Sequence, residues 1–265
     1  MEPFLELKNI SKTYALENRE TVEALHDVDF SVREGEFISL IGPSGCGKTT
    51  LMKILAGLVE PTTGELIAHK PEIFRNRGII FQQYNLFPWL TTEKNIDFGL
   101  SAIHVSAENR RKIITHYVQV MGLQGFENVY PKELSGGMQQ RVALARTLAT
   151  NPKLLLMDEP FSALDVQTKR FMQDLLLQVW SKEPRTIVFV THDVEEAVFM
   201  SDSIYIMSAH PGVIREKVKV DLPRPRDLHT EFSGEFIKLQ KYVQEIITKE
   251  ALGLEKLDLE IYKNL

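Results

Sequence analysis

The fold of this chain is decided by the stretch Gly42-Pro43-Ser44-Gly45-Cys46-Gly47-Lys48-Thr49, which fits the pattern G-x-x-x-x-G-K-[ST]. An apolar run, Phe37–Ile41, precedes it, and Lys48–Leu58 carries apolar residues at helical spacing. Strand, glycine-rich turn and helix in this order are typical of a phosphate-binding loop in an α/β protein. Glycines let backbone N–H groups converge on phosphate oxygens, Lys48 adds a cation, and the Thr49 hydroxyl can bind Mg²⁺.

The segments on either side predict a mixed α/β architecture. Short alternating runs in the first third indicate strands, and residues 92–150 show mainly helical periodicity. Apolar strands separated by helices return after residue 150. The predicted strands are Phe4–Ile10, Asp27–Arg33, Gly78–Phe81, Leu154–Met157, Thr186–Val190 and Ser203–Met207, and the later helices are Val166–Val179 and Val194–Met200.

The order of these segments predicts a nucleotide-binding α/β domain over residues 1–225 and a helical tail over 226–265. The domain has a core sheet, about 1–87 and 151–225, and an inserted helical subdomain, about 88–150. The Pro-rich segment Asp221–Asp227 is interpreted as a linker. An apolar stripe then indicates an amphipathic helix in the tail, formed by Phe236, Leu239, Val243 and Ile246.

Composition narrows the function classes. The net charge is −5 and the single cysteine is Cys46, so we expect no nucleic-acid surface and no internal disulfide. The first residues, MEPFLELKNISKTY, lack an apolar signal core, and no run approaches the roughly 18–20 apolar residues of a membrane helix. We expect a protein of the reducing cytoplasm that meets a membrane only from outside the bilayer.

Two acids follow the apolar strand Leu154–Met157. Asp158 and Glu159 then lie at the carboxyl end of a buried strand, where open α/β sheets bind ligands. Asp158 is placed to hold Mg²⁺, and Glu159 could polarise the water that attacks a γ-phosphate. Such a pair is alone more often a solvated strand end, but beside a phosphate loop it indicates catalysis.

A second anion site is predicted at Leu134-Ser135-Gly136-Gly137-Met138-Gln139-Gln140-Arg141, which opens a long helix. A serine cap and two glycines leave free N–H groups at the helix start. No lysine accompanies them, so the site suits a nucleotide held by a partner. A simple helix cap is the alternative for Ser135.

Together these motifs resemble the ABC ATPase family across nearly the whole chain, in the order GPSGCGKT, Gln82, LSGGMQQ, LLLMDEP, SALD and His192. The resemblance implies an α/β fold with a P-loop NTPase (RecA-like) core sheet, an N-terminal antiparallel β portion and an inserted α-helical subdomain. It implies a head-to-tail dimer, in which Ser135 and Gly137 of one subunit grip the γ-phosphate held by Lys48 of the other.

The resemblance also assigns roles to single residues. Gln82 senses Mg²⁺ and the attacking water, although the neighbouring Gln83 could take this place. Asp165 crosses the dimer interface, His192 contacts the γ-phosphate, and Tyr14 stacks on adenine. The implied cofactors are ATP and Mg²⁺. The implied catalytic residues are Glu159, His192 and Gln82; the metal ligands are Thr49, Gln82 and Asp158; the nucleotide contacts are Tyr14, Gly42, Pro43, Ser44, Gly45, Cys46, Gly47, Lys48, Thr49, Thr50, Ser135, Gly136, Gly137, Gln139 and Asp165.

The loop Asn85–Leu90 favours an importer, because FPWLT resembles the importer region that meets a membrane subunit. Phe87 and Trp89 could form an exposed docking surface or fold back onto the helical block. The segments SAHPG (208–212) and LPRPR (222–226) resemble the nitrate, sulfonate, taurine and bicarbonate importers. His210 departs from their usual arginine.

The expected partners are a second ATPase subunit, integral membrane permease subunits and, indirectly, a solute-binding protein. The expected place is the cytoplasmic face of the inner membrane, as a peripheral subunit. An ABC ATPase that assembles soluble protein complexes is the alternative. A lone nucleotide kinase or GTPase is a further class, but it leaves the SGG helix start unexplained.

Overall fold

The computed structural model describes residues 3–15, 20–70 and 72–252. The chain divides into two compact units, one formed by Met1–His69 with Val188–Leu265 and the other by Lys70–Ile187. Among the described residues, every helix is too short or too polar to cross a membrane.

The first unit opens with an antiparallel sheet in the strand order β2-β1-β4. β1 (Leu5–Ala15) and β2 (Thr21–Val32) confirm the two predicted N-terminal strands and extend both of them. β4 (Thr63–Ala68) was not predicted, because its residues are half-buried or exposed and carry no apolar alternation. A Cβ on Gly64 would lie 2.3 Å from the carbonyl oxygen of Asn9, so only glycine lets β4 approach β1 this closely.

A second set of strands in this unit positions the phosphate loop. β3 (Phe37–Ile41) pairs in parallel with β8 (Ser203–Met207), and all residues of both strands are buried. β9 (Ile214–Lys219) adds to β8 in antiparallel direction. The predicted strand at β8 is confirmed, as is β7 (Thr186–Val190) at the boundary of the two units. β9 was missed because charged residues interrupt its apolar ones.

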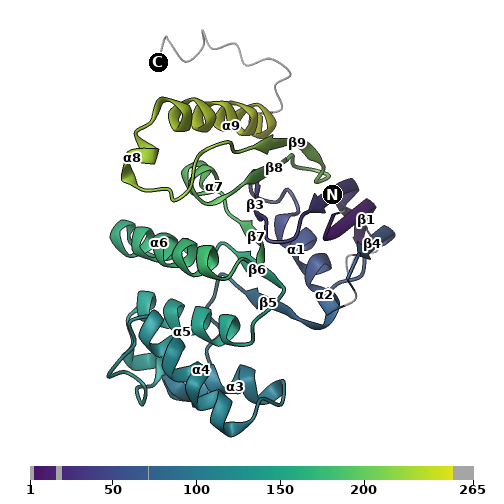
Figure 1. The fold of residues 1–265 in the computed structure, drawn as a ribbon. Helices are drawn as coiled ribbons and strands as arrows, with labels where there is room; N and C mark the ends of the chain where they lie inside the picture. Colours follow the sequence, from purple (N-terminus) through teal and green to yellow (C-terminus); the bar gives the residue numbers. More distant parts are fainter. Residues whose placement is uncertain (1–2, 16–19, 71, 253–265) are drawn as a thin grey trace. The chain divides into compact units, whose positions relative to one another are not determined.

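Helices complete the first unit. α1 (Lys48–Ala56) follows the phosphate loop, and α7 (Val194–Met200), which has the predicted bounds, contacts β3. The tail forms α8 (Leu228–Glu231) and α9 (Gly234–Leu252), and α9 contacts α7 and β8 (Figure 1). Phe236 and Val243 of the predicted stripe are buried, so the described part of the tail packs on its own unit.

The segment Asp221–Asp227 differs from a free linker. Arg226 is buried, and its guanidinium donates hydrogen bonds to the carbonyl oxygens of Val198, Phe199 and Ser201 at 2.7–3.0 Å. These carbonyls lie at the carboxyl end of α7, where a cation is favoured. Burial lowers the pKa of Arg226 to about 10, which leaves it charged at neutral pH.

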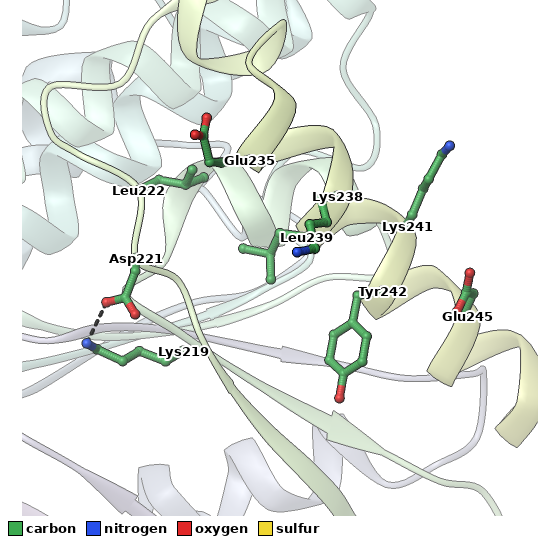
Figure 2. A pocket seen from close by; sticks show the side chains of 9 residues that line it. All are labelled: Lys219, Asp221, Leu222, Glu235, Lys238, Leu239, Lys241, Tyr242 and Glu245. Atoms are coloured by element: carbon green, nitrogen blue, oxygen red, sulfur yellow. Dashed lines mark ion pairs between the residues drawn. The ribbon is translucent and has the colours of Figure 1, made fainter.

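A cavity of about 610 Å³ lies between α9 and the chain that follows β9 (Figure 2). Leu222, Leu239 and Tyr242 provide its apolar wall. Lys219 and Asp221 form an ion pair at 2.5 Å on its edge. Its other lining residues are Glu235, Lys238, Lys241 and Glu245. The acids balance the lysines, so the cavity favours no ligand charge.

The second unit joins a pair of strands to a group of helices. β5 (Arg77–Ile80) pairs in parallel with β6 (Leu154–Asp158), and a four-residue helix, α2 (Glu72–Arg75), precedes β5. As predicted, the region 92–150 holds helices and no strand: α3 (Thr92–Ala102), α4 (Ala107–Val120), a 3₁₀ turn at Pro131–Glu133 and α5 (Gly136–Ala149) (Figure 1). α6 (Val166–Lys182) follows β6. The boundaries predicted for the core and the helical subdomain stay a prediction.

Candidate nucleotide site

The phosphate loop connects β3 to α1 within the first unit. Gly47 caps α1 with a left-handed backbone, φ 90°, and a Cβ there would lie 2.7 Å from the carbonyl oxygen of Ala24. A Cβ on Gly42 would lie 2.5 Å from the carbonyl oxygen of Met207. Glycine is therefore required at both ends, since any side chain would push the loop off the strands behind it.

Lys48 folds back over the loop that precedes it. Its ammonium group is buried and donates hydrogen bonds to the carbonyl oxygens of Gly42 at 2.8 Å and Pro43 at 3.0 Å. The first turn of α1, which holds Thr49 and Thr50, contains no acid. A buried cation, a helix N-terminus and a closely wrapped backbone fit a phosphate group.

Cys46 and Ser44 occupy the middle of the same loop. The Cys46 side chain is buried, and this burial raises the pKa of its thiol. Cys46 is therefore a neutral packing residue at physiological pH, and it contributes to the loop through its backbone. Ser44 and Gly45 are exposed, so this part of the loop is open to a ligand.

His192 lies at the same end of the strands as the phosphate loop. The N–H of Thr191, its neighbour, donates a hydrogen bond to the carbonyl oxygen of Leu40 in β3 at 3.2 Å. The imidazole is exposed, and Asp193 caps α7 directly after it. The structure thus places His192 and the loop that follows β3 at one edge of the first unit.

Tyr14 lies on β1, opposite Val22 of β2. Its ring is half-buried, and the Lys12 ammonium nitrogen is 5.2 Å from the ring centre. Lys12 also donates a hydrogen bond to the carbonyl oxygen of Glu60 at 2.8 Å, which fixes it beside the ring. Stacking of Tyr14 on adenine stays a prediction.

In the second unit the two acids follow β6 as predicted. Asp158 is buried at the end of the strand, and Glu159 adopts a left-handed backbone, φ 45°. Such a conformation is uncommon for glutamate and costs energy, and it turns the chain sharply after the strand. Strain of this kind is found at functional sites more often than elsewhere.

Gln82 is brought to the same turn. β5 pairs with β6 so that Ile80 lies opposite Met157. Gln82 therefore follows the end of β5 next to Asp158, the last residue of β6. The Gln82 amide donates a hydrogen bond to the Ser162 hydroxyl at 3.3 Å, and this hydroxyl donates to the carbonyl oxygen of Glu159 at 2.9 Å. Ser162, the first residue of the SALD motif, was not among the predicted site residues.

Ser135 caps α5 as the sequence predicted. Its hydroxyl accepts a hydrogen bond from the N–H of Met138 at 3.3 Å, and the first turn of α5 contains no acid. Ser135 and Gly136 are exposed. A Cβ on Gly137 would lie 2.6 Å from the Thr168 methyl carbon of α6, so the glycine permits close packing of the two helix starts.

Gln139 and Asp165 have structural partners. The Gln139 amide donates hydrogen bonds to the carbonyl oxygens of Pro131 at 3.0 Å and Leu134 at 3.1 Å, which holds the chain entering α5. Asp165 caps α6 by accepting from the N–H groups of Gln167 and Thr168. The hydrogen bond from Thr168 lowers the pKa of Asp165. A further contact of either side chain with nucleotide or a second subunit stays a prediction.

The residues predicted to hold Mg²⁺ offer oxygen atoms, the ligands that this ion prefers. The described residues contain no group of three or more His, Cys, Asp or Glu side chains that could hold a metal by themselves. Mg²⁺ is usually held by one or two protein oxygens together with phosphate oxygens and water. A hydroxyl at Thr49 and a buried carboxylate at Asp158 are donors of this kind, so the residues fit the ion.

The site residues fall into two sets. The phosphate loop, Tyr14 and His192 belong to the first unit, whereas Gln82, the acid pair, the α5 start and Asp165 belong to the second. In the first unit His192 lies at the same end of the strands as the phosphate loop, and in the second unit Ser162 joins Gln82 to the turn at Glu159.

The chain is similar to known proteins over most of its length. Residues 25–162 match the family model described as ABC transporter. The chain is 46% identical over 255 residues to an uncharacterized ABC transporter ATP-binding protein of Methanocaldococcus jannaschii, covering 95% of this chain and 94% of that protein. It is 44% identical to the aliphatic sulfonates import ATP-binding protein SsuB of Bacillus cereus, covering 88% and 92%.

Two further relatives extend the comparison. The nitrate import ATP-binding protein NrtD of Synechocystis is 42% identical and covers 83% of each chain. A solved ATP-binding cassette, described as a dimer in a post-hydrolysis state bound to ADP and Pi, is 36% identical with a TM-score of 0.72. The match covers 82% of this chain and 98% of the solved cassette. The P-loop NTPase fold and the resemblance inferred from the motifs are confirmed: the chain belongs to the ABC transporter family and is an ATP-binding protein that hydrolyses ATP.

Proposed function

We propose that this chain is the ATPase subunit of an importer and works as a head-to-tail homodimer. The observation that carries the proposal is a pair of acid-free helix starts, of which only that of α1 has a lysine. Ser135 and its glycines form an anion site without a cation, so they suit the γ-phosphate of ATP bound to Lys48 of a second copy. The dimeric cassette with ADP and Pi supports this arrangement.

Within each site the two units supply different parts of the chemistry. Mg²⁺, when bound, shields charge on the phosphates, and Thr49, Gln82 and Asp158 would hold it. Glu159 accepts a proton from the attacking water. Lys48, His192 and the α5 start of the partner face the charge that develops on the γ-phosphate. Hydrolysis therefore requires closure of the dimer.

The loop Asn85–Leu90 offers a docking surface for a membrane permease. Asn95 holds the loop, because its amide donates to the carbonyl oxygens of Phe87, Leu90 and Thr91 at 3.0–3.2 Å. The Phe87 ring packs against Phe98, with ring centres 4.4 Å apart.

Trp89 packs one side of its ring against Phe87, with ring centres 5.6 Å apart, and is 70% exposed. Phe98, which packs against the Phe87 ring, is 49% exposed. The two aromatic residues therefore differ: Phe87 folds back onto α3, whereas Trp89 forms the exposed part of the docking surface. A rigid aromatic surface of this kind suits a short helix of another protein.

The cargo is a small oxyanion or sulfonate, such as nitrate, taurine, an alkanesulfonate or bicarbonate. This choice rests on the named sulfonate and nitrate import relatives and on the SAHPG and LPRPR segments. A separate permease and a solute-binding protein would select the cargo. The ATPase subunit would lie peripherally on the cytoplasmic face of the inner membrane.

The Glu159→Gln variant tests the dimer. Without the carboxylate that takes the proton, turnover should fall by roughly 10²- to 10⁴-fold, whereas MgATP binding remains. Size-exclusion chromatography with light scattering should then show a dimer in MgATP and a monomer in MgADP. A strictly monomeric variant in MgATP, or normal turnover, would contradict the proposal. Co-purification with an integral membrane protein separates transport from assembly of soluble complexes.

A further inference from the structure

The turn between β8 and β9 lies behind the phosphate loop. Its ends are joined by a hydrogen bond from the N–H of Ser208 to the carbonyl oxygen of Val213 at 3.0 Å. Gly212 connects the turn to β2 by two hydrogen bonds. Its N–H donates to the carbonyl oxygen of Ala24 at 3.2 Å, and its carbonyl oxygen accepts from the N–H of His26 at 3.0 Å. The turn is thus closed at its own ends and hydrogen-bonded to β2.

Gly212 also brings this turn against the phosphate loop itself. A Cβ on Gly212 would lie 2.1 Å from the carbonyl oxygen of Cys46 and 2.9 Å from that of Ala24. Only a residue without a side chain permits this approach. The backbone of Cys46 is therefore supported from behind by a turn distant in sequence.

His210 reaches from the same turn to the exposed part of the loop. A Cβ placed on Gly45 would lie 3.3 Å from Cε1 and 3.6 Å from Nε2 of the His210 ring. The imidazole therefore covers the Cα of Gly45, on the side where other residues carry a side chain. Both residues have left-handed backbones, φ 50° for His210 and 80° for Gly45.

We infer that His210 is a positioning residue for the phosphate loop of this ATPase. Gly45 is the exposed, conformationally free residue of the loop, and glycine loses the most backbone freedom when it is fixed. The ring restricts Gly45 before nucleotide arrives, so less ordering is needed on binding. His210 acts on the affinity for ATP through the loop, without touching the reacting atoms.

The inference rests on ATP binding and not on the importer assignment, and the test uses the full chain alone. His210→Asn removes the ring but tolerates the left-handed backbone. His210→Phe keeps a flat ring of similar size. His229→Asn, in α8 and exposed, is the control for loss of a histidine elsewhere in the first unit.

The readouts are the dissociation constant for a fluorescent ATP analogue with Mg²⁺ and the KM and kcat for ATP. For His210→Asn we expect the dissociation constant and KM to rise about three- to tenfold, the effect of partly freeing one backbone residue. We expect kcat to stay within about twofold. His210→Phe should restore the affinity, and His229→Asn should match the unmodified chain.

Unchanged affinity in His210→Asn would overturn the inference, and so would a fall in kcat at constant KM. An equally weak His210→Phe variant would overturn the role of ring packing. Failure of the unmodified chain to bind the analogue would instead count against ATP binding. The measurement therefore separates the inference from the function on which it depends.

A second variant tests the contact from the other side. Gly45→Ala places a methyl group 3.3 Å from the ring and also strains the left-handed backbone. The strain is the same with or without the ring. Gly45→Ala should therefore weaken nucleotide binding less in the His210→Asn background than alone. Equal effects in the two backgrounds would mean that the residues do not interact, which overturns the inference.

Discussion

The starts of α1 and α5 share the local features that favour an anion but differ in what surrounds them. Both lack an acid in the first turn, and glycine lies at each start. At α1 the cap is Gly47, and a buried lysine completes the site from the same chain. At α5 the cap is the exposed hydroxyl of Ser135, and the described side-chain hydrogen bonds there serve the helix and the chain before it.

This difference suits the α1 start to hold a phosphate group by itself and the α5 start to add further donors to a phosphate that is already bound. A helix N-terminus supplies partial positive charge and N–H groups, which suffice to orient a phosphate but bind it weakly in water. The lysine at α1 adds a full charge in a buried place, where it is less screened. α5 is therefore suited to contribute only when ATP is already held opposite it.

Among changes at the two helix starts, the largest expected effect comes from Lys48→Met, which removes the charge that distinguishes α1 from α5. In the proposed site Lys48 faces phosphate in both the ground state and the transition state, so kcat/KM for ATP should fall by about 10³-fold. Lys53 lies in the last turn of α1, and Lys53→Met is the matched control, which should leave kcat/KM unchanged. Comparable losses in both variants would remove the assigned role of Lys48.

An intermediate effect is expected for Ser135→Ala at the α5 start. Turnover should fall by about 10- to 100-fold, because a donor to the partner's γ-phosphate is lost. Nucleotide affinity of the isolated chain should not change. Ser106→Ala is a matched control, since Ser106 caps α4 in the same way with Asn109.

Both serine variants should lose about 1 kcal/mol of helix stability, measured by denaturant unfolding. Although both variants lose the same stability, only Ser135→Ala should also lose turnover. If the two variants lose turnover equally, Ser135 is a helix cap and no more.

The smallest effect is expected where α5 meets α6. Gly137→Ala places a methyl group against the Thr168 methyl, and the unfolding free energy should fall by about 1–3 kcal/mol, the usual range for overpacking. Thr168→Ser in the same chain removes the obstructing methyl and should restore most of the loss. No restoration in chemical denaturation would show that Gly137 matters for another reason.

Much of the fold followed from local patterns. The apolar runs at β3, β6 and β8 identified buried strands, because strands covered on both faces carry few polar residues. The edge strands β4 and β9 escaped detection, since exposed residues leave no alternation to read. The Asp221–Asp227 segment was misjudged as a linker because Arg226 is anchored by carbonyls distant in sequence.

By itself the sequence determined the chemistry: a glycine loop with Lys48, an acid pair after a strand, and a serine-capped helix start. These features depend on neighbouring residues, whose types and spacing fix the local backbone and its donors. Only the tertiary structure decided which distant segments support them. Three contacts join segments whose spacing no local pattern encodes: Ser162 with Gln82, Thr168 with Gly137, and His210 with Gly45.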